Sequence, residues 1–251
     1  MKVDYYEFYS ENLNRNMPIK VYGHQGKPIL FIPCQDGHCY DFENFGMTDT
    51  FHDWIEGGRC IVYAIDTIDI ETWSANHANP YDRIRRHEAW ISYITREVVP
   101  FIRSDCNGKN GWDGYPGIMT FGCSMGATHA LNLYLRFPDL FDRCLALSGI
   151  YNASFFLGDY MDEVVYQNSI TDYLSNMSSD HPFIARYNNN KAVVCVGMGA
   201  WEEPWSTQYI DERFHELGIN IWVDYWGYDV NHDWPWWHKQ VPYFLPYLLE
   251  D

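Results

Sequence analysis

Short, continuously apolar segments recur along this 251-residue chain and constrain its fold more than any other feature. A strand that is buried on both faces has this pattern, as in a parallel sheet covered by helices. The segments lie at 28–33, 60–65, 118–121, 144–147, 192–196 and 220–225. Amphipathic helical stripes separate them, and this alternation predicts a mostly parallel sheet flanked by helices on both faces.

Two further strands are expected before the first apolar segment, at 3–9 and 18–22, so the first thirty residues predict a β-meander and the sheet has eight strands. The length suits a single domain over residues 1–251. Forty residues, 151–190, follow the sixth strand, which is more than a crossover helix needs. This insertion is either a cap over an active site or a surface decoration. Helical stripes are expected at 83–102, 127–135, 207–217 and from 236 onward.

Charge and cysteine content limit the partners. The net charge is -17, so nucleic acid and anionic membrane surfaces are poor partners. No apolar run reaches the 18 residues of a membrane span, and the first residues do not resemble a signal peptide. Seven cysteines without paired metal spacing suggest a reducing, cytoplasmic location. We expect no cofactor or metal, and the oligomeric state is open.

The motif Gly122-Cys123-Ser124-Met125-Gly126 follows one apolar segment directly and precedes a helical stripe. A strand–turn–helix setting is what a G-x-S-x-G nucleophile turn requires. The turn exposes its central residue, so Ser124 is the candidate nucleophile and Cys123 is the weaker rival. Met125 N–H is a candidate oxyanion donor, because the positive end of the following helix favours an anionic intermediate.

A serine nucleophile needs a histidine base and an acid that orients it, and in this motif's fold their order is Ser, acid, His. His232 follows the last strand, where the base is expected, whereas His238 lies in a helical pattern. The loop after 192–196 contains Glu202 and Glu203, of which we favour Glu202 as the acid. Asp211, on the next helical stripe, is a more distant alternative.

These residues give the chain a resemblance to the putative-esterase branch of the α/β-hydrolases, which includes esterase D-type enzymes, feruloyl and acetylxylan esterases and mycolyltransferases. The resemblance covers nearly the whole chain from Pro28 onward. It rests on Gly122 to Gly126, on Trp201-Glu202, on Asn231-His232-Asp233-Trp234, and on the loop Pro33-Cys34-Gln35-Asp36-Gly37-His38.

The resemblance implies an α/β-hydrolase fold and a second oxyanion donor in the loop after the strand at 28–33. By this likeness the donor is the backbone of His38, with Gln35 and Gly37 as alternatives. The acid varies among these relatives, and some place it on the following helix, which keeps Asp211 and Glu212 open.

The expected function is that of a serine carboxylesterase acting through an acyl-enzyme. Trp201 and Trp205 flank the acid in a loop, where exposed indoles could stack on a sugar or an aromatic acyl group. Trp73 and Gln35 are further candidates for substrate contact. The expected substrate is therefore a small-molecule or saccharide ester. The alternatives are an acyltransferase with the same triad and a non-catalytic carbohydrate- or partner-binding protein with this fold.

Overall fold

A computed structural model describes residues 1–114 and 116–250. Its strands are β1 (Val3–Ser10), β2 (Arg15–Tyr22), β3 (Lys27–Ile32), β4 (Cys60–Ile65), β5 (Ile118–Cys123), β6 (Phe141–Leu147), β7 (Lys191–Val196) and β8 (Trp222–Tyr225). They form one sheet in the order β1-β2-β4-β3-β5-β6-β7-β8. Strands β4, β3, β5, β6, β7 and β8 run parallel, and β1 and β2 are antiparallel. The mostly parallel eight-stranded sheet is confirmed, although it is mixed.

The predicted meander is wrong in one respect. Strands β1 and β2 form the expected hairpin, but β2 pairs with β4, and β3 lies between β4 and β5. The reason is the pattern of each strand. Exposed and covered residues alternate in β1 and through most of β2, which suits the edge of a sheet, whereas β3 is buried beyond its first residue and takes a central place.

The helices before and beside the nucleophile motif are α1 (Asp41–Asn44), α2 (Met47–Thr50), α3 (His52–Glu56), η1 (Asp69–Glu71), α4 (Pro80–Tyr93), η2 (Ile94–Val98), α5 (Val99–Asn110) and α6 (Met125–Arg136). The stripe predicted at 83–102 belongs to one continuous helical segment made of α4, η2 and α5. It begins where Asn79 accepts a hydrogen bond from the Tyr81 N–H, with Pro80 in the first position. It ends at Gly111, which has a φ of 65°.

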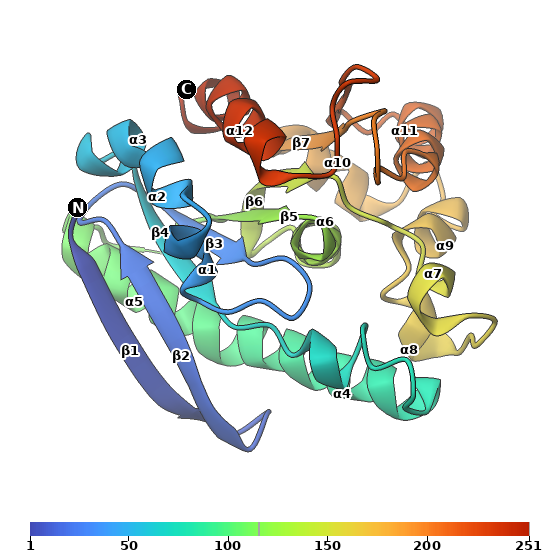
Figure 1. Ribbon diagram of the computed structural model, residues 1–251, viewed down its shortest axis with the longest axis horizontal. Helices are drawn as coiled ribbons and strands as arrows, with labels where there is room; N and C mark the ends of the chain where they lie inside the picture. Colours follow the sequence, from blue (N-terminus) through green and yellow to red (C-terminus); the bar gives the residue numbers. More distant parts are fainter. Residues whose placement is uncertain (115, 251) are drawn as a thin grey trace.

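The later helices are α7 (Ser154–Leu157), α8 (Glu163–Tyr166), α9 (Ile170–Ser175), α10 (Pro182–Asn189), α11 (Trp205–Leu217) and α12 (Trp234–Leu249). In Figure 1 the insertion at 151–190 runs past α4 and α11 at one end of the molecule. Leu157 of its first helix, α7, belongs to the same buried apolar cluster as Met125 and Trp73. Whether the insertion acts as a cap stays a prediction.

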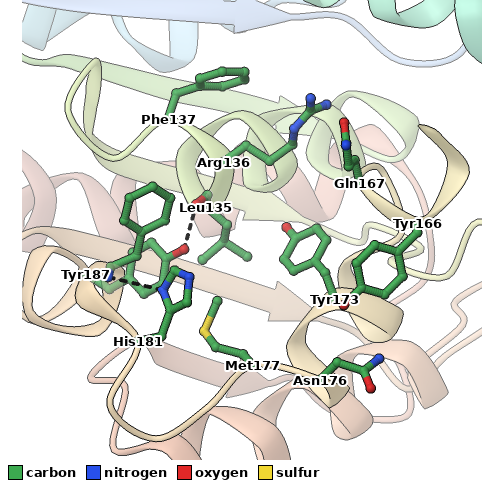
Figure 2. A pocket seen from close by; sticks show the side chains of 11 residues that line it. Leu135, Arg136, Phe137, Tyr166, Gln167, Tyr173, Asn176, Met177, His181 and Tyr187 are labelled. Carbon is green, nitrogen blue, oxygen red and sulfur yellow. Dashed lines mark hydrogen bonds between the residues drawn. The ribbon is translucent and has the colours of Figure 1, made fainter. Parts of the chain in front are cut away.

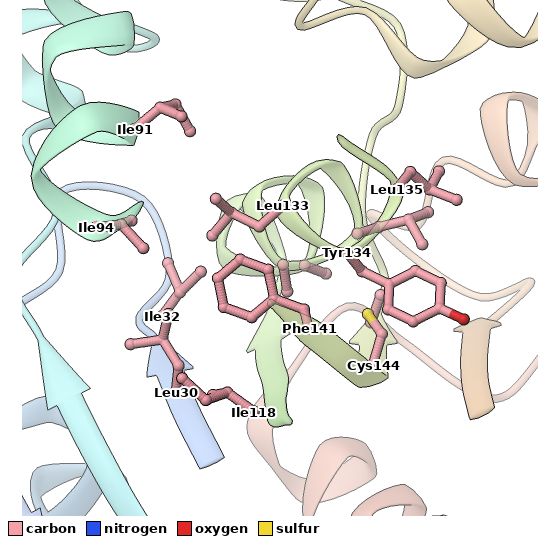
Figure 3. Close-up of a cluster of buried hydrophobic side chains, with 14 of the residues drawn as sticks. Leu30, Ile32, Ile91, Ile94, Ile118, Leu133, Tyr134, Leu135, Phe141 and Cys144 are labelled. Carbon is pink, nitrogen blue, oxygen red and sulfur yellow. The ribbon is translucent and has the colours of Figure 1, made fainter. Parts of the chain in front are cut away.

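Each face of the sheet has its own apolar core. On one face, Leu30 and Ile32 of β3 pack with Leu133 of α6 and with Ile91 and Ile94 of α4 and η2 (Figure 3). On the other face, the alternate residues of β3 pack with helices α1 to α3 and α12. This division explains why the strands read as unbroken apolar runs. Within the described ranges, no helix combines the length and the apolar character that crossing a membrane requires.

Candidate active site

Ser124 lies in the sharp turn between β5 and α6, with φ 57° and ψ -130°. This conformation is rare for a non-glycine residue and is typical of a nucleophile turn. The two flanking glycines allow it. A Cβ on Gly122 would lie 2.3 Å from the Gly126 carbonyl, and a Cβ on Gly126 would lie 2.3 Å from the Ile32 carbonyl oxygen. The turn therefore fits only because both side chains are absent.

His232 places its imidazole between the nucleophile and the acid. Its Nε2 lies 2.8 Å from Ser124 Oγ, and its Nδ1 lies 3.3 Å from Glu202 Oε2. Backbone hydrogen bonds hold its loop against the acid loop: His232 N–H donates to Ala200 at 3.0 Å, and Gly199 N–H donates to Val230 at 2.9 Å. The two loops thus position the base and the acid together.

The Glu202 side chain is almost fully buried, with 1% of its surface exposed. Its Oε1 accepts hydrogen bonds from Ser148 Oγ at 2.7 Å and from the Gly197 N–H at 3.3 Å, while Oε2 faces His232. These hydrogen bonds fix the orientation of the carboxylate. The structure therefore brings together Ser124, His232 and Glu202, the three side chains that the sequence predicts as a triad.

The other carboxylates from the sequence make different contacts. Glu203 accepts a hydrogen bond from the Ser206 N–H at 3.4 Å, at the start of α11. Asp211 accepts a hydrogen bond from Tyr225 Oη at 2.8 Å. Glu212 is exposed one residue further along the same helix. Of these candidate acids, Glu202 is the one whose carboxylate lies beside the His232 ring.

The alternative base and nucleophile are also placed elsewhere. His238 Nδ1 lies 2.6 Å from Thr50 Oγ1, where α12 packs against α2. Cys123 is buried, and this burial raises the pKa of its thiol well above the usual value, which disfavours the thiolate. Neither side chain has the contacts that a catalytic group at this turn would need.

The second oxyanion donor can be chosen by asking which backbone N–H groups of the loop after β3 do not already donate a hydrogen bond within the protein. The His38 N–H donates to Asp41 Oδ2 at 2.9 Å, and the Gly37 N–H donates to the Cys34 carbonyl at 3.0 Å. The expected donor at His38 is therefore already paired within its own loop. The Gln35 N–H has no acceptor within the part of the chain that the structure describes, which leaves it available. The Met125 N–H, in the first turn of α6, likewise has no acceptor among the described residues and can donate to an oxyanion.

Two buried residues support this loop and were not singled out from the sequence. Asp69 accepts a hydrogen bond from the Asp36 N–H at 3.4 Å and lies 2.9 Å from His129 Nε2. Since His129 lies on α6, one turn after Met125, Asp69 ties the loop to the helix that follows the nucleophile. Only a contact between distant segments reveals this role, and no local pattern signals it.

The tryptophans predicted to contact the substrate differ in how exposed they are. Trp201 is 90% exposed and Trp205 is 53% exposed, so both indoles are open to a ligand. Trp73 is only 3% exposed, and its Nε1–H donates to His87 Nδ1 at 2.9 Å. The expectation that Trp73 forms a pocket wall is therefore not supported. Its indole shares a buried apolar cluster with Met125 and contacts the Phe156 ring of the insertion, with ring centroids 5.1 Å apart.

A cavity of about 200 Å³ lies beside the acid loop and is lined by Ile150, Asn152, Ser154, Phe155, Glu203 and Trp205. A second cavity, of about 420 Å³, lies between the last turn of α6 and the insertion. Figure 2 shows Tyr173, Met177 and His181 facing it. Because α6 has 12 residues, this second cavity is about 18 Å along the helix from Ser124. The first cavity is lined by Glu203, which directly follows Glu202 in the chain.

Several solved structures share this fold over nearly the whole chain. A ferulic acid esterase is 17% identical, with a TM-score of 0.74, over 99% of this chain and 98% of that one. An S-formylglutathione hydrolase from Agrobacterium tumefaciens is 15% identical, with a TM-score of 0.70, over 98% and 93%. The fluorophosphonate-binding serine hydrolase F of Staphylococcus aureus is 13% identical, with a TM-score of 0.65, over 100% and 99%. No curated protein matches the sequence.

These likenesses confirm the α/β-hydrolase fold. The model of the family described as "Putative esterase" matches residues 10–248, which is almost the entire chain. The serine turn and the adjacent histidine and glutamate lie within this match. The chain therefore belongs to the putative esterase family, as a carboxylic ester hydrolase with an α/β-hydrolase fold.

Proposed function

We propose that the protein is a serine carboxylesterase that cleaves its substrate through an acyl-enzyme on Ser124. The observation that supports this most directly is the 2.8 Å contact between Ser124 Oγ and His232 Nε2, with Glu202 on the other side of the ring. A serine hydroxyl becomes a useful nucleophile when an adjacent imidazole can take its proton.

In the proposed reaction His232 Nε2 takes the Ser124 proton while Oγ attacks the ester carbonyl carbon. The amides of Met125 and Gln35 stabilise the resulting oxyanion. The imidazolium then protonates the leaving alcohol, the carbon–oxygen bond breaks, and Ser124 carries the acyl group. Water, deprotonated by the same imidazole, cleaves this ester and releases the acid.

The proposed substrate is an acylated carbohydrate or an ester of an aromatic acid. Support comes from the cavity of about 200 Å³ beside the acid loop, in which Phe155 and Trp205 lie with the polar side chains of Asn152 and Ser154. Aromatic surfaces stack on sugar or phenyl rings, and a few polar groups set their orientation. The Glu203 carboxylate and the net charge of -17 disfavour anionic substrates at this site.

The test compares wild type with Ser124→Ala on nitrophenyl acetate, nitrophenyl ferulate and an acetylated xylooligosaccharide. Wild type should hydrolyse at least one of them, and Ser124→Ala should be inactive. A wild type that is inert to all of them and to a fluorophosphonate probe would refute the proposal. Added acceptor alcohols identify an acyltransferase if the main product is a new ester.

A further inference from the structure

Ser148 connects the acid of the proposed triad to a buried tryptophan of α12. It follows β6 directly, has a φ of 59° and is only 3% exposed. Its Oγ lies 2.7 Å from Glu202 Oε1 and 3.1 Å from Trp237 Nε1. The proposed function has not used either residue, and they lie 54 and 35 positions from Glu202 in sequence.

The direction of these hydrogen bonds can be derived from the donor types. An indole N–H can only donate, so Ser148 Oγ must accept from Trp237. The single Ser148 proton is then free to donate to Glu202 Oε1. The Gly197 N–H donates to the same oxygen. Ser148 Oγ and the Gly197 N–H thus both fix the Glu202 carboxylate in place through Oε1.

The same direction continues to the nucleophile. Glu202 accepts through Oε2, so His232 Nδ1 is the donor in this contact. With Nδ1 as the donor, the Nε2 lone pair faces Ser124 Oγ. This is the tautomer that a general base needs. The Trp237 indole also forms a T-shaped contact with the His232 ring, with centroids 5.1 Å apart and an interplanar angle of 82°.

We propose that Ser148 is a positioning residue of the triad. It holds the Glu202 carboxylate oriented toward His232, and Trp237 fixes the direction of the Ser148 hydroxyl. This inference rests on the proposed function of Ser124, His232 and Glu202. The left-handed backbone of Ser148 is consistent with it, because a strained residue at a site is held there by its surroundings.

The test uses Ser148→Gly and Ser148→Ala on an ester that wild type hydrolyses. Glycine suits a φ of 59°, so Ser148→Gly removes the hydroxyl without backbone strain and should fold. Both variants should lower kcat by about 10- to 100-fold, as expected for a lost hydrogen bond to a charged group, with KM unchanged. Ser10→Gly is the matched control, because Ser10 is another buried serine, on the edge strand β1, and should keep wild-type kcat.

A double-mutant cycle separates positioning from a general structural effect. In a Glu202→Gln background, Ser148→Gly should lower kcat no further, because its target carboxylate is gone. An equal loss in both backgrounds, a loss confined to KM, or a Ser148→Gly variant with wild-type kcat would overturn the inference. Wild type without any esterase activity or fluorophosphonate labelling would refute the proposed function instead.

Discussion

Gly126→Ala is the substitution that most directly tests the close packing of the nucleophile turn. The new Cβ would lie 2.3 Å from the Ile32 carbonyl oxygen and 2.5 Å from the Pro33 carbonyl oxygen. To reach 3.0 Å from the first of these atoms, the start of α6 must retreat from β3 by about 0.7 Å. Both contacts are backbone atoms, one at the end of the central strand β3 and one in the residue that follows it, so a side-chain rotation cannot relieve them.

This retreat separates the two proposed oxyanion donors, because Met125 moves with α6 while Gln35 stays with the loop after β3. A displacement of about 1 Å at a reacting centre can cost about 100-fold in rate, and the loss of one donor costs about 100- to 1000-fold. We therefore expect kcat to fall by about 100-fold, while the free energy of unfolding falls by about 1–3 kcal/mol through overpacking.

The assay combines steady-state kinetics on a nitrophenyl ester with urea unfolding of the same preparation. The control is Gly108→Ala in α5, where an added Cβ meets nothing within 4 Å. Gly108→Ala should keep wild-type kcat and gain about 0.5–1 kcal/mol of stability as a helical alanine. A Gly126→Ala variant with wild-type kcat would refute the reasoning, because the donors would then tolerate the displacement.

Three further predictions concern single side chains. Glu202→Gln should lower kcat by about 10⁴-fold. Glu203→Gln should keep wild-type kcat and lower the free energy of unfolding by only about 0.5–1 kcal/mol, because its hydrogen bond at the start of α11 is weakened. Equal effects of the two variants on kcat would show that another residue is the acid. Burial, together with His129 and Arg136, lowers the pKa of His87 well below 6.5, so below pH 6.5 the unfolded chain alone binds a proton there. Acidification below pH 6.5 should therefore reduce the free energy of unfolding by up to about 1.4 kcal/mol per pH unit from this residue, and chemical denaturation of His87→Gln should show a shallower decline. Trp205→Ala should raise KM for nitrophenyl ferulate or an acetylated xylooligosaccharide and leave KM for nitrophenyl acetate unchanged. An equal change in KM for all three esters would show that Trp205 does not contact the substrate.

Local patterns predicted the parts of the fold that depend on nearby residues. Buried strands such as β5 read as apolar runs, and the glycines around Ser124 identified the turn. The order of Ser124, Glu202 and His232 along the chain was enough to predict that these three side chains lie together. Their catalytic roles stay a prediction. The place of β4 between β2 and β3 could not be predicted, because β3 and β4 are both continuously apolar and local sequence does not show which of them pairs with β2.

The oxyanion loop shows the limit of sequence reasoning most clearly. His38, Gln35 and Gly37 are equivalent as backbone donors in the sequence. The choice between them depends on whether Asp41 and the Cys34 carbonyl already accept a hydrogen bond. The prediction that Trp73 forms a pocket wall is not supported for a related reason, because the burial of its indole depends on helices far along the chain.

The central claim is that Ser124 is a nucleophile activated by His232. The most direct measurement is peptide mass spectrometry after reaction with a fluorophosphonate, performed on wild type, Ser124→Ala and His232→Ala. We predict one phosphonyl adduct on Ser124 in wild type, none at this position in Ser124→Ala, and a labelling rate in His232→Ala lower by several orders of magnitude. An adduct on another residue, or labelling of His232→Ala at the wild-type rate, would contradict the claim.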